Sequence, residues 1–258
     1  MAEKKEAPAT PATPAPAVPA VAPGTAVVDW QSQLSALAVA TAEAEKPSGN
    51  WVSFQGGRLK INGNLMKDDK VKAVVLYSIF ENQLYQGKYD SDNPTSPICY
   101  AFAETDDDLK PHPDSLKPQA DSCAVCPNNV WGSDPEGGRG KACKNVRRLA
   151  MMHEADLDKV EKAEVVMAKL PVTSVKNWST YANQLANVLK LPPLAVVTEM
   201  SVVPSPKTIF QVEFQLVDKV TDGATIQKLL ARRKDIHPLI FAPYDKPVEP
   251  KEQVARKF

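Results

Sequence analysis

The chain has 258 residues, 43% of them hydrophobic, which is enough to bury a core in one large domain or two small ones. Its 31 Lys and Arg residues balance 31 Asp and Glu residues, so attraction to nucleic acid or membrane must come from a local patch of charge. The sequence lacks the run of about eighteen apolar residues that a membrane-spanning helix needs, and its start, MAEKKE, lacks the apolar core of a secretion signal. The composition therefore predicts a cytoplasmic protein without a membrane partner.

Residues 1–28 contain the low-complexity tract PATPATPAPAVPAVAPG, which lacks the aromatic and large aliphatic residues that would offset the entropy of ordering. We expect a disordered, Ala/Pro-rich arm there. The composition changes at Asp29, which predicts the N-terminal cap of a short helix over residues 29–46. Four residues share one face of that helix: Trp30, Leu34, Leu37 and Thr41.

Two segments rich in β-branched and aromatic residues follow at 51–63 and 70–89, and they predict the strands of a curved sheet. Residues 90–145 are instead rich in Asp, Pro, Ser and Gly, with few periodic apolar positions. We expect this segment to form a loop that only its cysteines can organise.

Regular elements return after Arg147. The patterns predict a strand over AEVVMAKL, a helix after Thr173 or Ser174, a strand pair over LAVVTEMSVV and TIFQVEFQLVD, and a last helix capped by Asp222. The apolar faces of these helices are Val175, Trp178, Ala182, Leu185 and Leu189 in the first, and Ile226, Leu229 and Leu230 in the second. We expect a solvated tail from Tyr244 onwards.

This order of elements lacks the regular alternation of strand and helix that builds a parallel sheet. It predicts a mostly β, α+β fold: an antiparallel, OB-like sheet or barrel with a cysteine-rich metal loop and a few helices. One OB-like core domain would cover residues 51–245, with a metal-binding insertion at about 90–148 and a flexible C-terminal tail over 246–258.

The most informative feature is the clustering of all four cysteines, Cys99, Cys123, Cys126 and Cys143. Cys123-Ala-Val-Cys126 has the C-x2-C spacing that lets two thiolates reach one ion from a tight turn, and it predicts a structural metal site with all four as ligands. Zinc is favoured over an iron–sulfur cluster, although both take four thiolates. The alternative is that the cysteines are buried as small hydrophobic residues.

Five cations surround the last cysteine without an acid among them: Arg139, Lys141, Lys144, Arg147 and Arg148. A metal-tied loop that presents them predicts a phosphate-binding surface, and three aromatic residues, Tyr85, Tyr89 and Trp131, are candidates for stacking on bases of single-stranded DNA. The alternative is a solvated face whose counter-charges come from Asp106, Asp107, Asp108, Asp134 and Glu136.

Motifs of catalysis are missing from the sequence. It contains no G-x-x-x-x-G-K-[ST], G-x-S-x-G or H-E-x-x-H, and its three histidines form no acid–base motif with a carboxylate. We therefore expect a protein that is not an enzyme.

The segments CYAF, SCAVCPNNVWGS and GGRGKACKNVRRLA resemble bacteriophage proteins that carry a cysteine-rich insertion of this type, and QGKYDSDNPTSPICYAF and SVKNWSTYANQLA are similar in texture. The resemblance covers roughly residues 51–245 and is to phage single-stranded DNA-binding proteins of the zinc-containing OB-fold kind. It implies a protein that coats DNA in replication or recombination without sequence specificity, in the host cytoplasm, with replication proteins as further partners.

Two other functions agree with the same residues. One is a structural or scaffold protein in which the metal-tied loop docks onto a partner and the Ala/Pro-rich arm is a tether. The other is an iron–sulfur protein of nucleic-acid metabolism. Salt-dependent binding of oligo(dT) separates the DNA-binding protein from the scaffold, and visible absorption identifies an iron–sulfur cluster.

Overall fold

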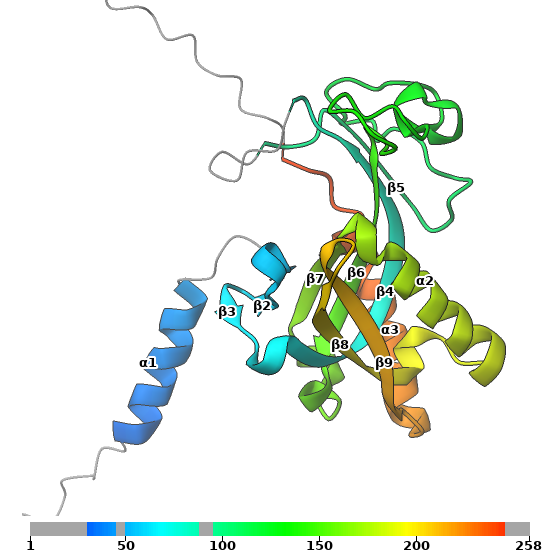
Figure 1. The fold of residues 1–258 in the computed structure, drawn as a ribbon. Helices are drawn as coiled ribbons and strands as arrows, with labels where there is room; N and C mark the ends of the chain where they lie inside the picture. The colour runs from blue at the N-terminus through cyan, green and yellow to red at the C-terminus, as the bar shows by residue number, and fades with distance from the viewer. Residues whose placement is uncertain (1–29, 45–49, 88–94, 246–258) are drawn as a thin grey trace, which may run out of the picture. The chain divides into compact units, whose positions relative to one another are not determined.

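The computed structural model describes residues 30–44, 50–87 and 95–245. The chain forms two compact units that separate between Lys46 and Pro47. In the first unit the described part is one helix, α1 (Trp30–Ala44), which confirms the helix expected from the sequence (Figure 1). The expectations for residues 1–28 and 246–258, and for Tyr89, lie outside the described residues.

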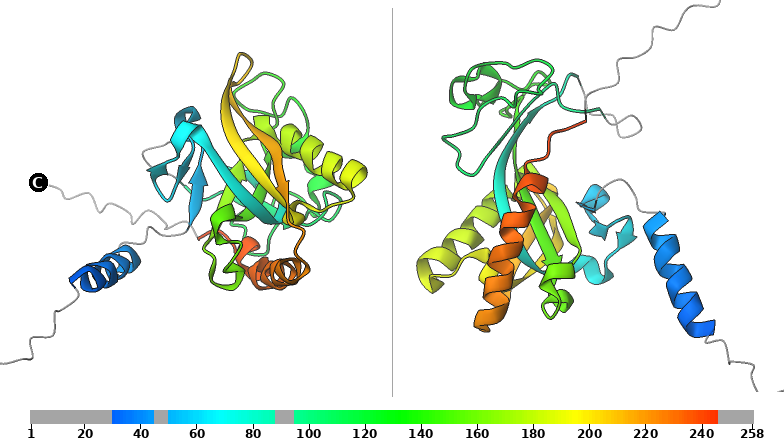
Figure 2. Two further views of the ribbon diagram at one scale, coloured as in Figure 1. Left: turned by 90° about the horizontal axis from the view of Figure 1, so that it is seen from below. Right: turned by 180° about the vertical axis from the view of Figure 1, so that it is seen from behind.

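The second unit is built on a nine-stranded mixed sheet that curls into a half-barrel (Figures 1 and 2). Its order is β3-β2-β1-β7-β6-β4-β8-β9, and β5 pairs with β4. The strands are β1 (Trp51–Ser53), β2 (Lys60–Ile61), β3 (Asn64–Leu65), β4 (Lys70–Leu84), β5 (Cys99–Ala103), β6 (Lys144–His153), β7 (Val165–Leu170), β8 (Val196–Ser205) and β9 (Ile209–Lys219).

The expectation of an antiparallel sheet holds for all the strand pairs of the described residues except one. β1 runs parallel to β7, so the sheet is mixed. The curl brings the first and last strands close together, because a side chain added at Gly57, which follows β1, would meet Phe210 of β9 at 3.5 Å. Gly57 also has a φ of +72°, a conformation that favours glycine.

The long central strand β4 explains how the sheet buries both of its faces. Val71, Ala73 and Val75 point to a core that includes Trp178 and Tyr181 of α2 (Val175–Gln184), which continues as a wider helical turn over Leu185–Leu189. The other face of the sheet packs against α3 (Gly223–Ile240) through Leu229, Ile236 and Ile240. A bulge between Val75 and Tyr77 exchanges the faces, so that odd-numbered residues beyond it point toward α3.

Both helices of the second unit agree with the apolar patterns of the sequence, except that Leu230, expected on the apolar face of α3, is exposed. Trp178 of α2 donates a hydrogen bond from Nε1 to Ser78 Oγ at 3.1 Å, and Asp222 caps α3 by accepting from the Thr225 amide at 2.7 Å. The strand pair β8–β9 is also confirmed. Across the described ranges, the structure contains no helix with the length and apolarity to cross a bilayer.

The loop expected over residues 90–145 requires correction. Cys99–Ala103 forms β5 and Lys144–His153 forms β6, and the two strands pair with opposite edges of the second half of β4. Cys99–Ala103 has only five residues and lies in a polar stretch, and Lys144–His153 begins with polar residues, so pairing with β4 decides their conformation. Tyr244, expected in the solvated tail, is half-buried against Phe102 and Lys169.

Candidate metal centre and nucleic-acid interface

The cysteine-rich segment lies over the end of β4, where β5 and β6 continue the sheet (Figure 1). Leu84 at the end of β4 is paired with Cys99 of β5, and the preceding Gln83 is paired with Lys144 of β6. Cys143 comes directly before Lys144. Two of the four cysteines are therefore positioned on either side of β4 by the register of the sheet.

The other two cysteines are held by a tight turn. Cys126 donates its amide to the carbonyl of Cys123 at 3.4 Å, and Cys123 donates to the carbonyl of Leu109 at 3.0 Å. The amide of Cys143 donates to the carbonyl of Asn128 at 2.8 Å. This last bond connects Cys143, directly before β6, to the turn that follows the C-x2-C pair.

The four cysteines line one cavity of about 10 Å³, room for a single water-sized sphere. All four are free thiols, and each residue is only 8% exposed. Among the described residues, no three His, Cys, Asp or Glu side chains already form a ligand cluster for a metal ion. The fold thus brings the four predicted ligands to one place, and a metal would have to draw their sulfur atoms together.

Burial is the largest influence on the pKa of three of these thiols. Burial first, and then the neighbouring cysteines, raise the pKa of Cys99, Cys123 and Cys143, the last to about 12. Like charges explain this second effect, because thiolates around one cavity repel each other. A cation at the centre would reverse it by favouring the deprotonated sulfur.

Polar groups near the same sulfur atoms oppose the effect of burial on the pKa. The backbone of Gln119 lowers the pKa of Cys99, the side chain of Asn82 lowers that of Cys123, and the backbone of Gln83 lowers that of Cys143. Such groups stabilise ligating thiolates in metal sites. Four soft sulfur donors with this support match the preference of zinc or an iron–sulfur cluster.

The histidines near this segment have other contacts. The ring of His112 stacks on Tyr100 with the centroids 4.9 Å apart, and its Nδ1 accepts from the Asp114 amide at 3.1 Å. His153 accepts from the Ala155 amide at 3.1 Å at the far end of β6. Neither histidine lines the cavity of the cysteines.

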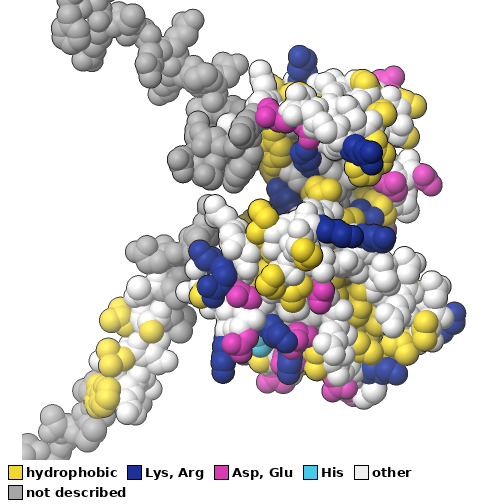
Figure 3. Space-filling model, in the orientation of Figure 1, with side chains coloured by type: hydrophobic (Ala, Val, Ile, Leu, Met, Phe, Trp, Pro, Cys, Tyr) yellow, Lys and Arg dark blue, Asp and Glu magenta, His cyan; other side chains and the backbone are white. Residues whose placement is uncertain are grey.

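Three of the five predicted phosphate-binding cations lie on the cysteine-rich segment. Arg139 is exposed, Lys141 donates to Asn129 Oδ1 at 3.1 Å, and Lys144 forms an ion pair with Asp134 at 2.8 Å. The pair with Lys144 also lowers the pKa of Asp134. Lys and Arg side chains are visible over this part of the molecule and along its junction with the half-barrel, with acidic side chains between them (Figure 3).

The remaining two cations, Arg147 and Arg148, are neighbours in β6 and point to opposite faces. Arg147 is half-buried, with its guanidinium 3.2 Å from the centre of the Phe80 ring, and burial lowers its pKa. Arg148 is only 3% exposed and forms an ion pair with Glu81 at 2.9 Å. The prediction that Arg148 contacts phosphate is therefore wrong for this conformation, because its guanidinium is already enclosed and paired.

The predicted stacking residues differ in accessibility. Trp131 is 74% exposed, and the Lys141 ammonium lies 5.5 Å from the centre of its ring. Tyr85 is half-buried and donates its hydroxyl to Gln83 Oε1. The sequence analysis did not single out Phe80, which presents a ring to Arg147, because its neighbours in the strand suggested a core residue.

Comparison of the chain with protein-family models, with curated proteins and with solved structures finds no match. The assignment of the site therefore depends on its own geometry. That geometry combines four buried thiols around a cavity with an exposed tryptophan and cations on the segment that contains the thiols.

Proposed function

We propose that this chain is a non-enzymatic single-stranded DNA-binding protein whose cysteine-rich segment is tied by a structural zinc ion. The observation that carries the proposal is the position of Trp131. Its ring is exposed beside the Lys141 ammonium, on a loop whose two ends are held by the thiol-lined cavity. An aromatic face next to cations is the arrangement that binds single strands without reading their sequence.

Zinc would bind the thiolates of Cys99, Cys123, Cys126 and Cys143. Four protein ligands leave no open position, so the ion would serve the fold and not catalysis. A structural zinc ion contributes roughly 10–16 kcal/mol in small zinc modules. Residues 95–143 need such support, because their hydrophobic cluster is small: Ala101, Ala103, Leu109 and Cys123, with Phe80 packed against them.

The curled sheet supports an OB-like interpretation of the fold. Small, partly open barrels of this kind bind oligonucleotides on one strand face and through the loops that connect the strands. Here the long connection between β5 and β6 carries the metal loop, and it projects from the end of β4 (Figure 1). A strand of DNA would cross this loop, with phosphates on the cations and bases on Trp131.

A salt titration of oligo(dT) binding tests the proposal. The slope of log affinity against log salt counts phosphate contacts, at about 0.7 per contact for single strands. Replacing Arg139, Lys141 and Lys144 together with Ala should reduce this slope by up to about 2 if all three contact phosphate. The matched control replaces three exposed lysines elsewhere, Lys162, Lys207 and Lys234, with Ala.

We expect the control to keep the slope of the wild type. A wild-type protein with zinc bound that shows no salt-dependent affinity for oligo(dT) would overturn the proposal and favour the scaffold function. Visible absorption from sulfur-to-iron charge transfer, together with iron in place of zinc in elemental analysis, would instead identify an iron–sulfur protein.

A further inference from the structure

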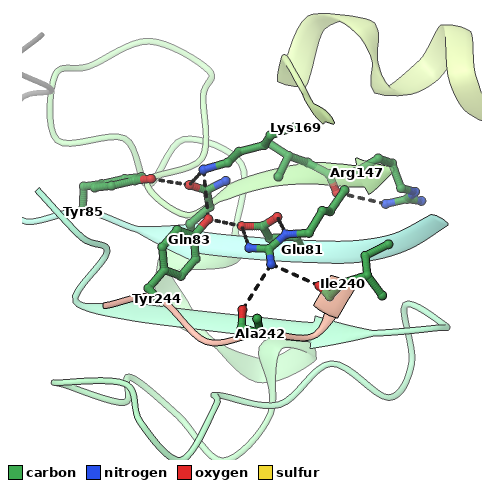
Figure 4. A network of polar contacts seen from close by, with 10 residues as sticks. Glu81, Gln83, Tyr85, Arg147, Lys169, Ile240, Ala242 and Tyr244 are labelled. Carbon is green, nitrogen blue, oxygen red and sulfur yellow. Dashed lines mark hydrogen bonds and ion pairs between the residues drawn. The ribbon is translucent and has the colours of Figure 1, made fainter. Parts of the chain in front are cut away.

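A second cluster of charged residues lies on the face of β4 opposite to the cysteines. Side chains alternate along a strand, so Asn82 and Leu84 line the cysteine cavity while Glu81 and Gln83 point the other way. Figure 4 shows Glu81, Gln83, Lys169 and Tyr244 joined in one polar network on that face. None of the expectations for DNA binding involved Lys169 or Tyr244.

The register of the sheet brings two cations together in this network. Arg148 of β6 is paired directly with Lys169 of β7. Arg148 is held by Glu81, through bonds of 2.9 and 3.1 Å, and by the carbonyl oxygens of Ile240 and Ala242 at 3.1 and 3.2 Å. Lys169 donates to the Tyr244 hydroxyl at 2.9 Å and to Gln83 Oε1 at 3.4 Å, both neutral groups.

Among the residues that the structure describes, the network therefore has two positive charges and one carboxylate. Tyr244 adds no negative charge, because burial and the nearby Glu81 raise its pKa and keep it a neutral phenol. Like charges that face each other across neighbouring strands are destabilising unless a counter-charge is present. Burial lowers the pKa of Lys169. Of its charged neighbours, Glu81 raises that pKa and Arg148 lowers it, so the two cations share one carboxylate.

An exposed aromatic ring lies beside Arg148. Trp51 of β1 is 38% exposed, and its ring centre is 5.6 Å from the Arg148 guanidinium. It is paired with Met167 in the parallel β1–β7 ladder, and Lys169 follows Met167 by two residues on the same face. A half-buried ammonium and an exposed indole thus share one face of neighbouring strands.

We infer that Trp51 and Lys169 form a nucleotide subsite, in which the ammonium binds one phosphate of a single strand and the indole stacks on an adjacent base. The inference rests on the proposed DNA-binding function and adds a contact surface on β1 and β7, separate from the Trp131 loop. The phosphate adds a negative charge to the single carboxylate that the described residues contribute to the network. Arg148 stays a structural residue that is buried next to Lys169, and its charge adds to the positive potential at the subsite.

Two variants separate the roles of the subsite. Lys169→Gln removes the charge and keeps hydrogen-bonding capacity, and we expect it to reduce the salt slope of oligo(dT) binding by about 0.7, the value for one phosphate. Lys169→Arg keeps the charge and should keep the wild-type slope. If Lys169 had only a structural role, Lys169→Gln would leave the slope unchanged. Lys219→Gln, at an exposed position of β9, is the matched control and should leave the slope unchanged.

Trp51→Leu should lower affinity by roughly 5- to 150-fold with an unchanged slope, because stacking releases no counterions. The fluorescence of Trp51, taken as the difference between the wild type and Trp51→Phe, gives a readout that does not require the Lys169 variants to fold. Oligo(dT) should quench this component. An abasic oligonucleotide of equal length, which keeps the phosphates, should not.

The outcomes distinguish the two levels of the proposal. Binding of oligo(dT) by the wild type, with a reduced slope in the Arg139, Lys141 and Lys144 variant, would support the loop proposal. If Lys169→Gln then keeps the full slope, or the fluorescence of Trp51 is not quenched, the subsite is wrong and the loop proposal stands. If the wild type has no salt-dependent affinity for oligo(dT), both are wrong.

Discussion

Glu81 and Arg148 form a two-point ion pair inside the sheet, with Nε to Oε2 at 2.9 Å and Nη2 to Oε1 at 3.1 Å. The pair is diagonal in the β4–β6 ladder, because Arg148 is paired with Ile79 and Glu81 with Val146. Arg148 also donates to the last carbonyls of α3 and its extension. This one side chain therefore joins two strands of the half-barrel to the end of the C-terminal helix.

Removing the carboxylate alone should destabilise the protein strongly. Glu81→Gln leaves a buried guanidinium without its counter-charge, a change that typically costs about 3–5 kcal/mol in free energy of unfolding. Urea denaturation would measure the loss. The double variant Glu81→Leu with Arg148→Met removes both charges and should recover much of it, and a double variant less stable than Glu81→Gln would contradict this explanation.

The proposed zinc site predicts that substitution of any one of the four cysteines has the same effect. Each of Cys99→Ser, Cys123→Ser, Cys126→Ser and Cys143→Ser should lower the zinc stoichiometry and increase hydrogen exchange of residues 95–143, while β8 and β9 stay protected. Native mass spectrometry would count the metal. One full equivalent of zinc retained by the Cys99→Ser protein would remove Cys99 from the ligand set.

Several elements were predictable because their signals are local. The apolar face of α2, the Asp222 cap of α3 and the strand pair β8–β9 each depend on residues close together in sequence. The C-x2-C turn is local as well. These patterns describe how a segment buries its own apolar side, and the tertiary structure agrees with them.

The other features of the fold and of the candidate site depend on contacts between residues that are far apart in the sequence. Arg148 belongs to a basic run typical of a solvated surface, and only pairing with Glu81, from another strand, shows that it is buried. Cys99 and Cys143 line the same cavity because β5 and β6 pair with opposite edges of β4. Tyr244 follows a helix and precedes a polar tail, so its contact with Lys169 has no local signal.

The cap of α3 predicts a dependence of stability on pH. Asp222 accepts hydrogen bonds from the hydroxyl and the backbone amide of Thr225, both at 2.7 Å, and these bonds lower its pKa below the ordinary 3.8. A carboxyl with a lowered pKa stabilises the fold fully above its unfolded pKa. That contribution is lost as the pH falls through the folded pKa.

Melting temperatures of three proteins over about pH 3–7, a range that spans the ordinary pKa of Asp, would test this. Asp222→Ala loses the cap at every pH, so its difference from the wild type should shrink on acidification. Asp222→Asn keeps a capping side chain that does not titrate, and its difference from Asp222→Ala should stay constant. A wild-type advantage over Asp222→Ala that is independent of pH would show that ionisation of Asp222 adds nothing to the cap.

Trp131 and Trp30 give a matched pair for the stacking contribution. Both indoles are largely exposed, 74% and 62%, but Trp30 belongs to α1 in the first unit and Trp131 to the cysteine-rich segment. Trp131→Ala should weaken oligo(dT) binding by about 1–3 kcal/mol, the usual contribution of one stacked base, and should leave the salt slope unchanged. Trp30→Ala should leave both the affinity and the slope at the wild-type values. Fluorescence anisotropy of a labelled oligo(dT) at several salt concentrations gives both quantities. Equal losses of affinity in the two variants would show that exposure of an indole, and not its place beside Lys141, determines binding.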